Sequence, residues 1–187
     1  MTAFITLPGI GGSGETHWQT IWEAEDPRFV RFQPSDWDRP DLSDWIAAVD
    51  RAVAKASEPP ILVAHSLACL LVSAWAAKTD DAGRRVRGAL LVAVPDPEGP
   101  AFPRAQAPSF TGKQRGALTF PALVVASTND PYGTIDYVRE RAAEWNAGLV
   151  VLGPLGHING ASNLGRWPEG LALLEAFAAG TRPTGRS

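Results

Sequence analysis

The stretch Ile61-Leu62-Val63-Ala64-His65-Ser66-Leu67-Ala68-Cys69-Leu70-Leu71 decides the fold class. It reads as a short apolar strand that passes into an apolar helix without turn residues between them. A bend this sharp brings the two backbones nearly into contact, so small side chains are needed two positions before and after its apex. Ala64 and Ala68 occupy those positions around Ser66. The stretch predicts a nucleophile elbow with alanines in place of both glycines of G-x-S-x-G. An ordinary strand–helix junction is the alternative.

Length and composition predict one domain over residues 1–180, with a polar, frayed tail over 181–187. The 187 residues are 45% hydrophobic and 20% charged, which is typical of a globular protein. A net charge of −3 gives no attraction to nucleic acid or to an anionic membrane. No apolar run approaches the roughly 18 residues of a membrane span, and the N-terminus lacks the basic region of a signal peptide. We therefore expect a cytoplasmic protein without nucleic-acid or membrane partners.

Strands and helices alternate along the chain. Six segments read as strands, at 4–7, 29–33, 88–94, 122–126, 149–152 and in the apolar run that begins at Ile61. Helices are predicted at 15–25, 42–56, 134–146 and 169–178, and directly after Ser66. The last three strands are apolar without alternation, which is typical of parallel strands covered on both faces. The pattern predicts a three-layer α/β sandwich around a mostly parallel, six-stranded sheet. The segment 95–121, with six prolines, is the exception and reads as a functional cover or a mobile segment.

The residues that follow the predicted strands carry the chemistry, because ligands of an open parallel sheet bind at the carboxyl ends of its strands. Ser66, Asp130 and His157 follow three strands in the chain order of α/β-hydrolase triads. A serine hydroxyl needs a base to take its proton, and histidine titrates near neutrality. An aspartate would fix the imidazole tautomer. Asp96 is the rival acid, although its Pro-Asp-Pro setting is typical of a turn.

A glycine-rich loop follows the first strand. Its spacing Gly9-x-Gly11-x-x-Gly14 matches the dinucleotide pattern, but Pro8 stands at the strand exit. In addition, no second strand ends in the acidic residue that a ribose contact requires. The other use of such glycines is to bring backbone N–H groups close to a substrate oxygen. We therefore expect the N–H groups of Ile10 and Leu67 to form an oxyanion hole.

Three polar residues are candidates for lining the same pocket: His17, His65 and Asn159. His65 adjoins Ser66, but a residue beside the apex of the elbow is expected to point away from it, which makes it a poor base. His17 stands at the start of a helix, where packing beside Trp18 is the alternative.

Several motifs together resemble a known family. They are Pro8-Gly9-Ile10-Gly11-Gly12, His17-Trp18, Asp36-Trp37, and the segments 64–68, 126–132, 156–159 and 167–170. With them the chain resembles the YdeN-like serine hydrolases, small α/β-hydrolases that include the retinoblastoma-binding protein nine type, over about residues 4–177. The resemblance implies Ser66 as nucleophile, Asp130 as acid and His157 as base, in a compact fold without a large cap domain. Relatives often retain a glycine where Ala68 stands, and we expect its methyl group to tighten the turn without abolishing activity.

We therefore expect a serine hydrolase that acts on small carboxylic esters, or on amides or thioesters, through an acyl-enzyme. No cofactor and no metal are expected, since one cysteine and three histidines argue against a structural zinc site. The missing cap and the loop 95–121 predict a shallow site for small acyl groups. One alternative is a protein-interaction module on a hydrolase scaffold with little or no turnover. A nucleotide-binding oxidoreductase that uses residues 9–14 is a second alternative.

Overall fold

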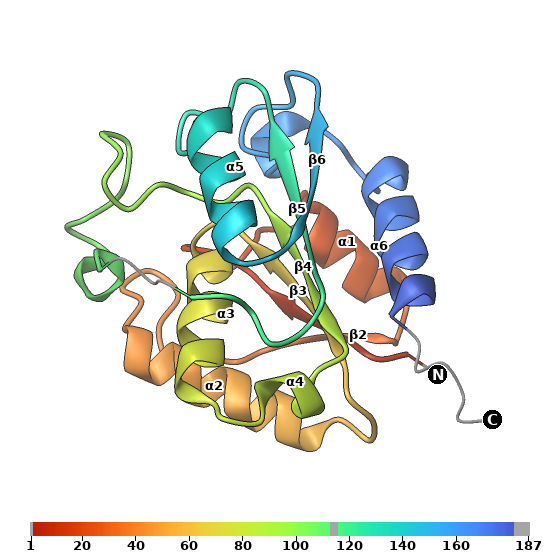
Figure 1. The fold of residues 1–187 in the computed structure, drawn as a ribbon. Coiled ribbons are helices and arrows are strands. Elements are labelled where there is room, and N and C mark those ends of the chain that lie inside the picture. The colour runs from red at the N-terminus through yellow and green to blue at the C-terminus, as the bar shows by residue number, and fades with distance from the viewer. Residues whose placement is uncertain (1, 113–115, 182–187) are drawn as a thin grey trace.

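The structure, a computed structural model, describes residues 2–112 and 116–181 of the chain. Within these residues a six-stranded sheet runs through the molecule in the order β2-β1-β3-β4-β5-β6 (Figure 1). Its neighbouring strands are all parallel. The strands are β1 (Phe4–Leu7), β2 (Phe29–Arg31), β3 (Ile61–His65), β4 (Gly88–Val92), β5 (Ala122–Ser127) and β6 (Gly148–Leu152). This arrangement confirms the predicted six-stranded parallel sheet.

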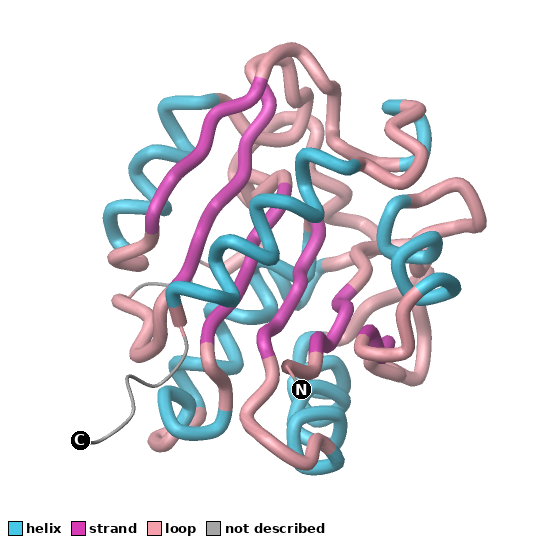
Figure 2. Tube along the Cα trace, turned by 90° about the vertical axis from the view of Figure 1, so that its right-hand side faces the viewer, coloured by secondary structure: helices cyan, strands magenta, loops and turns pink. Residues whose placement is uncertain are grey.

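Helices cover both faces of the sheet and complete the three predicted layers (Figure 1 and Figure 2). One face packs against α1 (Trp18–Glu25) and α6 (Pro168–Gly180), and the other against α2 (Leu42–Lys55), α3 (Leu67–Lys78) and α5 (Ile135–Glu144). The short helix α4 (Ala82–Arg85) precedes β4, and 3-10 turns lie at Pro108–Phe110 and Gly160–Ser162. Among the described helices, none is long and apolar enough to cross a bilayer.

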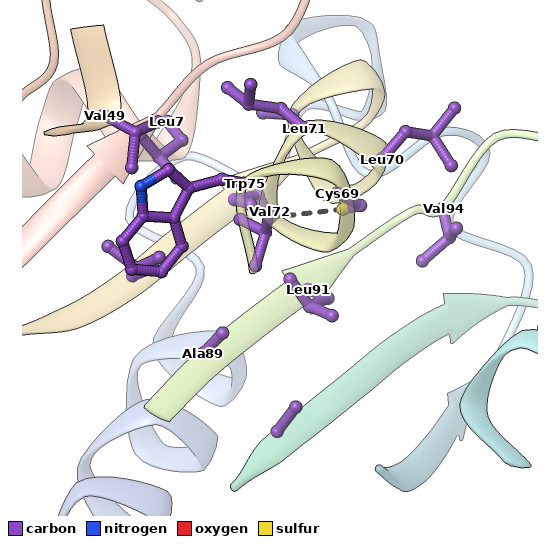
Figure 3. Close-up of a cluster of buried hydrophobic side chains, with 14 of the residues drawn as sticks. Leu7, Val49, Cys69, Leu70, Leu71, Val72, Trp75, Ala89, Leu91 and Val94 are labelled. Atoms are coloured by element: carbon purple, nitrogen blue, oxygen red, sulfur yellow. Dashed lines mark hydrogen bonds between the residues drawn. The ribbon is translucent and has the colours of Figure 1, made fainter. Parts of the chain in front are cut away.

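The central strands bury side chains on both faces. In β3, Leu62 and Ala64 pack into one hydrophobic cluster, and Ile61 and Val63 pack into a second cluster on the opposite face. Successive side chains of a strand point to opposite faces, so a strand covered on both sides must be apolar throughout. Helix α3 lies against the first cluster and buries all residues from 67 to 75 (Figure 3). The strand–helix junction at Ser66 therefore lies between two deeply buried elements.

Edge strand β6 contradicts the prediction that its apolar run is covered on both faces. In the predicted run 149–152 the side chain of Val151 is 40% exposed, and the other three residues are half-buried. The reason is that β6 pairs with β5 alone. A continuous apolar run in the sequence does not distinguish a central strand from an edge strand.

Some predicted boundaries also move. The helix expected from Glu15 begins at Trp18, because the Nδ1 atom of His17 accepts a hydrogen bond of 3.2 Å from the Gln19 N–H and caps the helix. The strand expected over 29–33 ends at Arg31, and the short helix α4 lies before β4, where no helix was expected. The single domain over 1–180 and the frayed tail over 181–187 stay predictions. Beyond Thr181 that tail lies outside the described residues.

The described part of the proline-rich segment 95–121 is packed onto the body of the molecule. Phe102, Phe110 and Phe120 are buried in the hydrophobic cluster that also holds α3. The hydroxyl of Ser109 accepts a hydrogen bond of 3.0 Å from the N–H of Leu42 at the start of α2. The segment is therefore anchored to the face of the sheet that α3 covers by its own aromatic side chains.

Candidate active site

Ser66 stands at a strained bend between β3 and α3. Its backbone has φ 56° and ψ −126°, a region that non-glycine residues rarely adopt. The Ser66 N–H donates to Val92 O at 2.9 Å, and Ser66 O accepts from the Cys69 N–H at 2.9 Å. A Cβ atom added to Gly9 would lie 3.0 Å from the Cβ of Ser66, so the glycine-rich loop and the bend nearly touch. The sharp bend expected at the Ser66 apex is thus present, supported by backbone hydrogen bonds on both sides.

His157 contacts Ser66, and Asp130 contacts His157, as predicted from their positions after the strands. The Oγ atom of Ser66 lies 2.8 Å from Nε2 of His157, and both carboxylate oxygens of Asp130 lie 2.9 Å from Nδ1 of His157. A carboxylate only accepts hydrogen bonds, so Nδ1 carries the proton and Nε2 of a neutral ring accepts from the Ser66 hydroxyl. The side chains of His157 and Asp130 are 9% and 4% exposed. The contact between His157 and Asp130 is therefore largely shielded from water.

The rival acid Asp96 has a different environment. Its carboxylate accepts a hydrogen bond of 2.9 Å from the Glu98 N–H, and its own N–H donates to Tyr132 O at 2.8 Å. Within the described residues no hydrogen bond joins Asp96 to His157. Asp96 thus forms a turn after β4, and Asp130 is the carboxylate that contacts the imidazole.

Side chains from the end of β5 hold the loop that carries His157. The Ser127 hydroxyl accepts a hydrogen bond from the Leu155 N–H at 2.9 Å and donates to Asn129 Oδ1 at 2.9 Å. The same Asn129 oxygen accepts from the Gly156 N–H at 2.7 Å. The sequence motifs did not single out Ser127 or Asn129 as supporting residues, although both stand just before Asp130 at a strand end.

The predicted oxyanion donors lie at the place where the two loops approach each other. Both Ile10 and Leu67 border the cavity in front of Ser66. In the part of the chain that the structure describes, neither N–H donates to a protein acceptor. Next to them, the Gly11 N–H donates to Trp37 O at 3.0 Å and the Gly12 N–H to Gly9 O at 3.1 Å. The loop thus uses its neighbouring N–H groups internally and leaves that of Ile10 available.

Comparisons with known proteins agree on the family. A family model described as serine hydrolase matches residues 4–176. The chain belongs to the serine hydrolase family.

Several solved structures are similar to this chain over nearly its whole length. A YdeN-like hydrolase from Pectobacterium atrosepticum is 28% identical and superimposes with a TM-score of 0.84, over 98% of this chain and 94% of that chain. The ydeN gene product of Bacillus subtilis is 16% identical with a TM-score of 0.69, over 96% and 100% of the two chains. A monoacylglycerol lipase from Paleococcus ferrophilus is 12% identical with a TM-score of 0.69, over 95% and 96%. No curated protein sequence matches. Together with the family match, these likenesses support a small serine hydrolase of the YdeN-like type with a compact α/β-hydrolase fold.

The other two histidines of this serine hydrolase lie beside His157. His65 donates its Nε2–H to His157 O at 2.9 Å, and its ring centre lies 5.0 Å from that of His157, so it does not point away from the site. Burial holds the pKa of His65 well below its usual value. Burial, followed by the charges of Arg31 and His157, lowers the pKa of His17 to about 4. Both additional rings are therefore neutral at pH 7.

A cavity of about 660 Å³ opens in front of Ser66. The three candidate lining residues His17, His65 and Asn159 all border it, and His17 also packs against Trp18 with ring centres 5.2 Å apart. Tyr132 covers His157 with ring centres 4.4 Å apart. The loop 95–121 contributes Ala101, Phe102, Pro103 and Gln106 to the wall. Within the described residues no group of three or more His, Cys, Asp or Glu side chains is placed to bind a metal ion.

Proposed function

We propose that this hydrolase cleaves small carboxylic esters through an acyl-enzyme on Ser66, with His157 as the base and Asp130 as the acid. One observation carries the proposal: the 2.8 Å contact between Ser66 Oγ and His157 Nε2, with Asp130 bonded to the other ring nitrogen. That geometry matches the requirement of a serine nucleophile for an oriented base within hydrogen-bond reach. Amides and thioesters are the alternative substrates.

The proposed reaction has two halves. Ser66 Oγ attacks the carbonyl carbon while His157 Nε2 takes its proton, and the N–H groups of Ile10 and Leu67 donate to the developing oxyanion. The tetrahedral intermediate collapses, the ester C–O bond breaks, and the alkoxide leaves with the proton from His157. A water molecule then gives its proton to His157 and attacks the acyl-enzyme, which releases the carboxylic acid and restores Ser66. Asp130 stabilises the imidazolium in both halves.

The cavity favours uncharged esters of modest size. Its lining includes Pro95, Ala101, Phe102 and Pro103. These side chains offer apolar contacts, and neutral His17 and His65 offer no charge to a substrate carboxylate. A volume of about 660 Å³ lies within the range of pockets that hold drug-sized ligands, so acyl groups longer than acetyl should be accepted.

The decisive experiment is the variant Ser66→Ala. We expect it to lose p-nitrophenyl acetate and p-nitrophenyl butyrate turnover and labelling by a fluorophosphonate probe, while circular dichroism and Tm stay near those of the wild type. Ser73→Ala, a change in the same helix α3, is the matched control and should keep full labelling. A labelled Ser66→Ala protein would contradict the assignment. A folded wild type without turnover or labelling would favour the protein-interaction module.

A further inference from the structure

The glycine-rich loop that carries Ile10 needs an external support. Gly11, Gly12 and Ser13 all have positive φ, at 78°, 73° and 54°. Glycines of this kind leave a loop with many accessible conformations in the absence of other contacts. An oxyanion donor must nevertheless be held in place before the reaction, since its contribution falls if it reorganises during the step. The contacts that fix this loop therefore bear on catalysis.

Arg31 at the end of β2 provides that support. Its Nη1 donates to Gly12 O at 2.6 Å and to Ser13 O at 3.3 Å. Its Nη2 donates to Thr20 Oγ1 at 2.7 Å, and the Thr20 hydroxyl donates to Ser13 O at 2.8 Å. The Arg31 guanidinium thus binds two consecutive loop carbonyls, those of Gly12 and Ser13. It also contacts the Ser13 carbonyl indirectly, through the Thr20 hydroxyl at the start of α1.

Arg31 is itself held rigidly. Its Nε donates to both carboxylate oxygens of Glu23, at 3.0 and 2.9 Å, and Nη2 lies 2.9 Å from Glu23 Oε2. The Arg31 and Glu23 side chains are 20% and 17% exposed, so water competes little for the pair. The hydroxyl of Thr6, a fully buried residue of β1, donates to Glu23 Oε1. A planar guanidinium with this many partners has a fixed orientation, which a lysine would not reproduce.

We infer that Arg31 is a positioning residue for the oxyanion hole: by binding the carbonyls of Gly12 and Ser13, it fixes the loop that presents the N–H of Ile10. The inference rests on the proposed function, because it assigns the oxyanion to that N–H. Loss of Arg31 weakens the binding of the transition state and leaves the binding of the substrate ground state nearly unchanged. The effect therefore falls on kcat and not on KM.

The test compares Arg31→Met with Arg28→Met. Arg28 also forms ion pairs, with Asp26 and Glu175, but within the described residues it has no hydrogen bond or ion pair to the loop. For Arg31→Met with p-nitrophenyl butyrate, we expect kcat to fall about tenfold and KM to stay within about twofold of the wild type. This decrease in kcat is smaller than the one caused by deleting an oxyanion donor, because the donor is still present. The inhibition constant of butylboronic acid, whose tetrahedral adduct imitates the oxyanion, should rise by the same factor. Arg28→Met should match the wild type in both measurements.

Two further variants complete the test. Millimolar guanidinium should restore part of the kcat of Arg31→Ala and have no effect on Arg28→Ala. If Arg31→Met does not fold, Thr20→Val removes the bridging hydroxyl without a change of charge. Its kcat and boronate affinity should both fall about two- to threefold, because Arg31 still binds the two loop carbonyls directly. Unchanged kcat in a folded Arg31→Met or in Thr20→Val, or an equal decrease in Arg28→Met, would overturn the inference. An active Ser66→Ala would instead refute the proposed function.

Discussion

Ser66 occupies a backbone conformation that its neighbours impose. A non-glycine residue at such φ and ψ costs on the order of 1–3 kcal/mol, which the surrounding structure has to offset. The hydrogen bond from the Ser66 N–H to Val92 O and the buried helix α3 behind it hold the residue in place. The result is a hydroxyl presented to the cavity within reach of His157.

The two candidate acids can be separated by matched substitutions. Asp130→Asn should lower kcat by about 10⁴-fold, because an amide does not stabilise the imidazolium and permits the wrong tautomer of His157. Asp96→Asn should leave kcat within about twofold, since Asp96 contacts a backbone N–H group of its own turn. Steady-state kinetics on p-nitrophenyl butyrate give the answer. A larger decrease from Asp96→Asn than from Asp130→Asn would reverse the assignment.

At the scale of elements, the loops after β5 and β6 behave as one unit. Ser127, the last residue of β5, and Asn129 just after it accept hydrogen bonds from the N–H groups of Leu155 and Gly156 in the loop after β6. Gly156 has φ +61°, a conformation that suits glycine and turns the chain toward His157. The distance between Asp130 and His157 is therefore set by side chain–backbone hydrogen bonds between two loops.

The variant Asn129→Ala tests this link. It removes the acceptor of the Gly156 N–H, which we expect to cost about 1–2 kcal/mol of unfolding free energy and to lower kcat about tenfold by freeing the His157 loop. Thr128→Ala is the neighbouring control, because Thr128 contacts Gly153 through its backbone N–H. Urea unfolding and kcat are the measurements. Equal kcat in the two variants would show that the hydrogen bond does not position His157.

At the scale of the whole molecule, the parallel sheet brings the site together. The carboxyl ends of β1, β3, β5 and β6 lie along one edge, and the loops that leave them carry Ile10, Ser66, Asp130 and His157 (Figure 1). The same packing buries His17 and His65 beside them as neutral rings. The site therefore includes two imidazoles whose protonation destabilises the fold.

This burial predicts how stability depends on pH. Unfolded His17 has a pKa near 6.5 and folded His17 near 4, so between these values the unfolded chain binds a proton that the folded chain lacks. Acidification from pH 7 to pH 5 therefore destabilises the fold, by about 2 kcal/mol from His17 alone. The variant His17→Asn keeps an N-cap acceptor, and acidification from pH 7 to pH 5 should destabilise it less than the wild type. Buried His65 remains in the variant, so its stability should still depend on pH to some extent. Urea unfolding at pH 7 and pH 5 measures the unfolding free energy of both proteins. An equal loss of unfolding free energy in the wild type and in His17→Asn would contradict the prediction.

Local patterns of residues are enough to predict the strands, the chain order of the proposed catalytic residues and the bend at Ser66. Apolar periodicity reports burial, and the small side chains of Ala64 and Ala68 report a sharp turn, because both effects act between residues close together in the chain. Asp96 and Asp130 both follow strands, and the family motifs favoured Asp130.

Which side chains touch depends on the fold as a whole. Three contacts of the site join segments that are far apart in the chain: Asp130 with His157, His65 with His157, and Arg31 with the glycine-rich loop. The exposure of β6 likewise depends on which elements pack beside it. Such contacts depend on how rigid elements pack and where their loops end, to within fractions of an ångström. Local patterns in a sequence carry no measure of that distance.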